Sequence, residues 1–111
     1  MNTTTFSNTP IDVVQFPGTL EKPALKAFTK NIKPILNKKQ QRLIIDLSNL
    51  KNLDWQGATY LLSLFKKVTK KRGIMIIAQA SPEVQAYMEL IQLQRVVEIV
   101  SDEETAMSIM A

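Results

Sequence analysis

The chain has 111 residues, of which 45% are hydrophobic and 22% are charged, and its formal net charge is +4. These proportions are near the averages for soluble globular proteins, and the length suffices for one core, so we expect a single domain over residues 1–111. The absence of cysteine and histidine excludes cysteine nucleophiles, Ser-His-Asp triads and zinc sites built from these ligands.

The first third of the chain predicts two extended segments followed by a helix. Residues 3–7 and 11–16 have the pattern of strands, and the turn-forming residues 8–10 between them predict an N-terminal hairpin. From Glu21 onwards the apolar residues recur at steps of three and four, which is typical of one helical face. Pro34 falls inside this pattern, where it predicts a kink or an ending just before it. The expected core face is Leu25, Phe28, Ile32, Ile35 and Leu36.

The middle of the chain predicts two buried strands with a helix between them. Residues 43–47 and 74–78 are short, nearly continuous apolar runs, as in strands buried on both faces. Residues 57–71 predict a helix whose last turns are basic and which Gly73 terminates. Its expected core face is Ala58, Leu61, Leu62, Phe65 and Val68.

The last third predicts a helix, a strand and a final helix. Ser81 and Pro82 fit the cap and first turn of a helix, and residues 96–100 predict a short strand. Ser101 and Glu104 have the spacing of a capping box for a helix through Met110. The resulting alternation predicts an α/β fold with a mostly parallel, four- to five-stranded sheet and helices packed on it, with residues 43–47 and 74–78 central.

Several function classes lack sequence support. Neither of the two common phosphate-binding glycine motifs is present, and no clustered catalytic motif appears, so we expect neither an enzyme nor a cofactor. The apolar runs are too short to cross a bilayer, and the polar start lacks a signal-peptide pattern, so we expect a cytoplasmic protein without membrane insertion. Residues 1–72 carry a net charge of +9 and residues 73–111 one of −5. This asymmetry indicates either a basic face for nucleic acid or solvated lysines on helix surfaces, and we favour the second.

Residues 43–57, LIIDLSNLKNLDWQG, resemble the signature of the STAS family, the domain of anti-sigma factor antagonists and of sulfate transporter tails. In that family a buried strand ends in Asp-Leu, and an Asp-Ser-Ser-Gly tetrapeptide opens the next helix. The segments FPGTLE, from residue 16, and SPEVQAYMELIQLQRVVEIVSDEETAM, from residue 81, are also similar to the family, so the resemblance spans nearly the whole chain. It implies a STAS-like fold.

The chain departs from the family at the residue before Gly57. Members that kinases switch have a phosphorylated Ser, or sometimes Thr, at this place, whereas this chain has Gln56. A glutamine side chain has no hydroxyl to accept a phosphoryl group, so the resemblance implies that the usual switch is absent. Thr59 and Ser63 have hydroxyls near this position and are candidates for a displaced phosphoacceptor, although packing or solvation is the better explanation for their hydroxyls.

The resemblance implies that a protein partner binds at Asp54, Trp55, Gln56, Gly57, Tyr60 and Leu64. Asp54 is also explained as a helix cap. Trp55 is the single tryptophan and a candidate binding hot spot, unless its ring folds back on its own domain. Tyr60 and Leu64 lie one turn apart and form a candidate contact surface, unless a neighbouring helix covers them.

The resulting hypothesis is a regulatory interaction module that resembles an anti-sigma factor antagonist and acts in signalling and transcription regulation in bacteria. Its expected partner is an anti-sigma kinase of the GHKL type or another regulatory subunit. The alternative within the same family is a subunit that binds the ATPase of an ABC-type lipid transport complex. A nucleic-acid-binding domain that uses the basic first two-thirds of the chain is a third and weaker hypothesis, because no aromatic residues alternate with the cations from Lys66 to Arg72.

Overall fold

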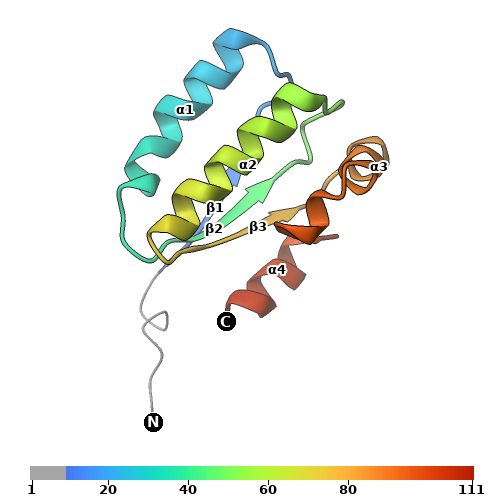
Figure 1. The fold of residues 1–111 in the computed structure, drawn as a ribbon. Coiled ribbons are helices and arrows are strands. Elements are labelled where there is room, and N and C mark those ends of the chain that lie inside the picture. Colours follow the sequence, from blue (N-terminus) through green and yellow to red (C-terminus); the bar gives the residue numbers. More distant parts are fainter. Residues whose placement is uncertain (1–9) are drawn as a thin grey trace.

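The computed structural model describes residues 10–111, which form a parallel sheet with helices on both faces (Figure 1). The four strands lie in the order β1-β2-β3-β4, and each pairs in parallel with its neighbour. The expected α/β fold is therefore confirmed. The elements in chain order are β1 (Ile11–Gln15), α1 (Lys22–Leu36), β2 (Arg42–Asp46), α2 (Trp55–Lys70), β3 (Ile74–Ala78), α3 (Pro82–Leu90), the 3₁₀ turn η2 (Leu93–Arg95), β4 (Glu98–Val100) and α4 (Glu103–Met110).

The N-terminal hairpin is only partly covered by the structure. Its first segment, residues 3–7, lies outside the described residues. Its second segment corresponds to β1, which pairs in parallel with β2 in the register Ile11 to Arg42 through Gln15 to Asp46.

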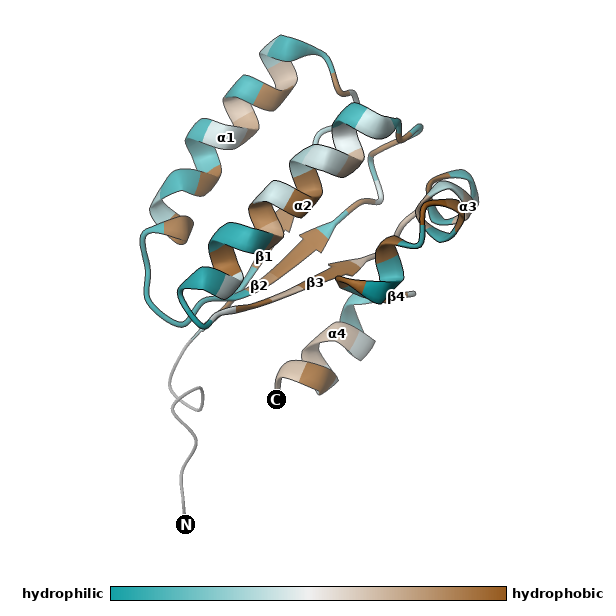
Figure 2. Ribbon diagram, viewed as in Figure 1, coloured by the Kyte–Doolittle hydropathy of each residue, from teal (hydrophilic) through white to brown (hydrophobic). Residues whose placement is uncertain are grey.

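The sheet separates two apolar clusters of different size. Leu43 and Ile45 of β2 point into the larger cluster, under α1, α2 and α3, whereas Ile44 joins Ile76 in the smaller one under α4. Ile44, Ile45 and Ile76 are fully buried, as expected for central strands covered on both faces. Figure 2 shows this arrangement as hydrophobic strands between helices that also carry hydrophilic residues. In residues 10–111 no helix is long and apolar enough to span a membrane.

Pro34 does not end α1, which continues to Leu36. The last turn is retained because Ile35 and Leu36 pack against the larger cluster. The Leu36 carbonyl, one of those left free at the helix end, accepts hydrogen bonds from Gln41 Nε2 at 2.9 Å and from Lys71 Nζ at 2.8 Å.

The capping box predicted at Ser101 and Glu104 is wrong, because the cap lies one residue later. The carboxylate of Asp102 accepts a hydrogen bond from the Thr105 backbone N–H at 2.7 Å. This bond stabilises the charged carboxylate and lowers the pKa of Asp102.

Gly73 follows α2 at a point where two backbone segments come close. The left-handed residue of this turn is Arg72, with a φ of 62°, so Gly73 is not needed for the turn itself. A Cβ on Gly73 would lie 2.8 Å from the Gln41 carbonyl oxygen and 3.0 Å from the Gln41 nitrogen. Gly73 is therefore required by the close approach of the α2–β3 turn to the start of β2.

We expect Gly73→Ala to lower the free energy of unfolding by roughly 1 to 3 kcal/mol, because the added methyl group overpacks against backbone that cannot rotate away. The matched control is Gly57→Ala, where a Cβ would meet only the ends of the Leu53 and Leu20 side chains. Urea unfolding measures both variants. Equal stabilities of Gly73→Ala and the unchanged protein would contradict the close approach.

Candidate functional site

The N-terminal end of α2 carries the residues Asp54, Trp55, Gln56 and Gly57. Asp54 is the N-cap, and its Oδ1 accepts a hydrogen bond from the Gly57 backbone N–H at 2.9 Å. The helix begins at Trp55, two residues earlier than predicted, so Trp55 and Gln56 lie in its first turn rather than in a loop. Both side chains are exposed, and they project from helical rather than loop backbone.

Gly57 lets the loop after β1 lie against this first turn. A Cβ at Gly57 would come within 2.7 Å of Leu53 Cδ1 and 2.8 Å of Leu20 Cδ1. The absence of a side chain thus allows Leu20 and Leu53 to pack directly on the helix backbone. The loops that follow β1 and β2 meet α2 at this point.

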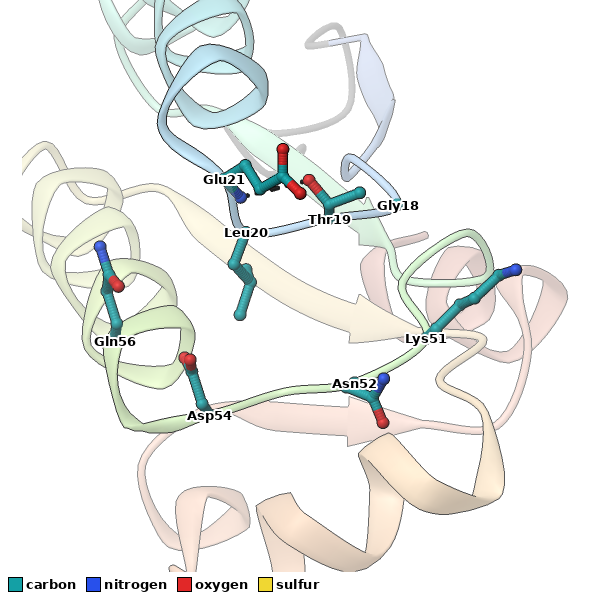
Figure 3. A pocket seen from close by; sticks show the side chains of 8 residues that line it. All are labelled: Gly18, Thr19, Leu20, Glu21, Lys51, Asn52, Asp54 and Gln56. Carbon is teal, nitrogen blue, oxygen red and sulfur yellow. Dashed lines mark hydrogen bonds between the residues drawn. The ribbon is translucent and has the colours of Figure 1, made fainter.

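A polar hollow of about 490 Å³ lies on one side of the helix end, lined by residues 18–21, Lys51, Asn52, Asp54 and Gln56. Figure 3 shows that its walls come from the loops after β1 and β2 and from the first turn of α2. It therefore lies at the carboxyl ends of the parallel strands β1 and β2. Its charged groups are the carboxylates of Glu21 and Asp54 and the ammonium group of Lys51.

An apolar groove of about 280 Å³ lies on another side of the same helix end. Trp55, Ala58, Thr59 and Leu62 of α2 form one wall, and Ile91, Gln92, Leu93 and Val96 form the other. The Trp55 side chain is 70% exposed, so the ring does not fold into the core of its own domain. We name this surface the Trp55 groove.

Sequence reasoning missed the second wall of the Trp55 groove. Residues 96–100 were expected to form one strand, but β4 begins only at Glu98. The preceding turn η2 leaves Val96 52% exposed, whereas Val97 is fully buried. The pair Val96 and Val97 gave no signal of this difference, because adjacent valines fit a strand equally well.

Tyr60 and Leu64 do not form the contact surface that the sequence predicted. Leu64 is 4% exposed and belongs to the larger apolar cluster. Tyr60 is half-buried, its ring centroid lies 6.1 Å from that of Phe28, and its hydroxyl shares a 2.7 Å hydrogen bond with that of Thr29. Helix α1 thus covers this side of α2, which was the alternative explanation, and Leu64 offers no surface to a partner.

Thr59 and Ser63 are exposed residues of α2, and Thr59 borders the Trp55 groove. Within residues 10–111 there is no group of three or more acidic side chains arranged to hold a metal ion.

The arrangement at this end of α2 offers two recesses, one polar and one apolar, with Trp55 and Gln56 between them. Such a surface is suited to binding another molecule by shape and apolar contact.

Comparisons with known proteins agree with this geometry. Residues 5–106 match the family model described as STAS domain. A candidate anti-sigma factor antagonist from Thermotoga maritima has a similar fold, with a TM-score of 0.74 and 16% identity over 90% of this chain and 86% of that chain. A STAS domain anti-sigma-factor antagonist from Planctomyces limnophilus gives a TM-score of 0.75 and 16% identity, with 88% of each chain covered. No curated protein sequence matches the chain.

We expect Asp54→Ala to lower the free energy of unfolding by about 1 kcal/mol, because the Gly57 N–H loses its acceptor. Asp54→Ser is the matched control, since serine is an equally good cap and should retain most of the stability. Urea unfolding compares the two. An Asp54→Ser variant as unstable as Asp54→Ala would show that the carboxylate has a role other than capping.

Proposed function

Because the chain belongs to the STAS domain family, we propose that it is a non-catalytic regulatory module of the anti-sigma factor antagonist type, which binds a protein partner through the N-terminal end of α2. The binding surface consists of Asp54, Trp55, Gln56 and the Trp55 groove. The buried Gly57 supports this surface from within, and Tyr60 and Leu64 hold α2 against α1 and the sheet.

The exposed ring of Trp55 is the observation that carries this proposal. Tryptophan is enriched among binding hot spots, because one large ring removes much apolar area from water when it docks. Here the ring is 70% exposed beside the apolar side chains of Leu62, Ile91 and Val96. A partner side chain that fills the groove would cover the ring and these residues together.

The residue type at position 56 supports a partner interaction without a phosphorylation switch at this position. Its side chain is exposed in the first turn of α2, where a hydroxyl would be accessible to a kinase. The amide that stands there has no oxygen able to accept a phosphoryl group. Binding therefore depends on the presence of the partner rather than on a modification at this position.

Two partners fit this surface. The first is an anti-sigma kinase of the GHKL type, in keeping with the two similar structures described as anti-sigma factor antagonists. The second is the ATPase subunit of an ABC-type lipid transport complex. Gln56 favours this partner, because a constitutive subunit of a complex needs no phosphoacceptor.

We expect Trp55→Ala to weaken partner binding at least about thirtyfold, which corresponds to the ~2 kcal/mol of a hot spot. The midpoint of thermal unfolding should hardly change, because the ring is 70% exposed. Leu90→Ala is the matched control, since Leu90 is 77% exposed and lies outside the groove lining. Calorimetric titration against the purified kinase and the purified ATPase subunit from the same genome measures binding and identifies the partner. Unchanged affinity of Trp55→Ala for the partner that binds would refute the proposed surface.

We expect no phosphate on the protein after incubation with the kinase and ATP, whereas Gln56→Ser should gain one phosphate at residue 56. Peptide mass spectrometry locates the modification. Phosphate on Thr59 or Ser63 of the unchanged protein would show that the switch has moved along α2 rather than vanished. Heat-inactivated kinase with Gln56→Ser is the control for non-enzymatic transfer.

A further inference from the structure

Helices α1 and α2 form a layer that is rich in cations and has no acidic side chain. Neither Lys22–Leu36 nor Trp55–Lys70 contains an aspartate or a glutamate. The two helices lie on the same face of the sheet (Figure 1), and the hydrogen bond between the hydroxyls of Thr29 and Tyr60 joins them. Their exposed cations are Lys22, Lys26, Lys30, Lys33, Lys66, Lys67 and Lys70.

The lysines of α1 form one stripe, because they follow one another at steps of three and four residues. Thr29 lies three residues after Lys26 and four before Lys33, so the stripe runs beside the contact with α2. On α2, Lys67 lies two helical turns after Tyr60 and therefore on the side that faces α1. The lysines of α1 and Lys67 of α2 thus gather over the seam between α1 and α2, and we name this surface the lysine face.

The lysine face continues into a hollow where the two helices end. Asn37, Lys39, Gln40, Lys70, Lys71 and Arg72 line it, and its volume is about 630 Å³. No acidic residue contributes to the lining. Among residues 10–111, the ion pair between a lysine and a carboxylate is that of Lys38 with Asp12, 3.1 Å apart. The seven exposed lysines of α1 and α2 therefore have no carboxylate partner in this part of the chain.

We propose that the lysine face binds the surface of a bilayer that contains anionic phospholipids. Two helices side by side on a sheet present a broad face, which a planar array of headgroup phosphates can meet at many lysines at once. The hollow at the helix ends adds space for a phosphate group between Lys39, Lys70 and Arg72. Contact is electrostatic, without insertion of an apolar segment.

A nucleic acid fits this face less well. Readers of duplex DNA place a helix or a β-ribbon in a groove, whereas these cations lie across two helices packed on a sheet. Binders of single strands stack bases on exposed aromatic rings. On the lysine face the ring of Tyr60 is half-buried against Phe28, and Trp55 lines the groove on the side of α2 that faces η2.

The lysine face and the Trp55 groove occupy different sides of α2. The groove is bounded by Ile91, Leu93 and Val96, which follow α3, whereas the lysine face lies toward α1. A protein bound in the groove therefore leaves the lysine face accessible. The proposed membrane contact is independent of the identity of the partner.

The test is co-sedimentation of the full chain with vesicles of phosphatidylcholine containing roughly one-third phosphatidylglycerol, with pure phosphatidylcholine vesicles in parallel. We expect binding to the anionic vesicles only. This binding should disappear when salt is raised from about 0.1 M to about 1 M, because the screening length falls from ~10 Å to ~3 Å. Binding to both vesicle types alike, or to neither at low salt, would overturn the proposal.

Two double variants with the same change in net charge locate the contact. Lys26→Gln with Lys67→Gln should weaken binding to anionic vesicles roughly tenfold or more, whereas Lys51→Gln with Arg95→Gln should change it less than about twofold. All four side chains are exposed, and circular dichroism confirms that each variant is folded. Equal losses in the two variants would overturn the assignment to the lysine face. Tighter binding to a generic DNA duplex than to the anionic vesicles, at equal salt, would assign the face to nucleic acid instead.

Discussion

Helix α2 is held in place at both ends by close packing around a glycine. At its start, Gly57 lets Leu20 and Leu53 pack on the helix backbone, and beyond its end Gly73 lets the turn approach the backbone of Gln41. Between these points Leu61, Leu64 and Val68 pack into the larger apolar cluster. Because both ends of the helix are fixed by close packing, the backbone from which Trp55, Gln56 and the lysines project is fixed as well.

The elements were predictable from the sequence because their apolar patterns are local. The runs at residues 43–47 and 74–78 gave β2 and β3 within one residue, and the periodicity after Glu21 gave α1. The start of α2 was placed two residues late, at Gly57, whereas the helix begins directly after its cap Asp54. Of the two outcomes expected at Pro34, a kink or an ending, the ending does not occur, because the packing of Ile35 and Leu36 extends α1 to Leu36.

The candidate site was predictable only in the part that lies at one helix end. An aspartate just before a helical pattern predicts a helix cap, and Asp54 is the N-cap of α2. The single tryptophan beside it, Trp55, was a candidate contact residue on the same grounds of position and residue type. Which neighbour covers Tyr60 and Leu64, however, depends on where α1 packs, and the periodicity of α2 does not contain that information. For the same reason the far wall of the Trp55 groove, more than thirty residues along the chain, emerges only from the fold.

The strand order β1-β2-β3-β4 also bears on how the protein is made. Each strand adds to the edge left by the one before it, so the sheet can grow in the order in which the ribosome delivers it. The cover over Ile44 and Ile76 comes last, from Ala106 and Met110 of α4. The Arg42 guanidinium donates a hydrogen bond to the Met110 carbonyl, and this acceptor is synthesised 68 residues after Arg42. During synthesis one face of the sheet therefore stays open until α4 has left the exit tunnel, and a nascent chain stalled before that point would expose an apolar surface to chaperones.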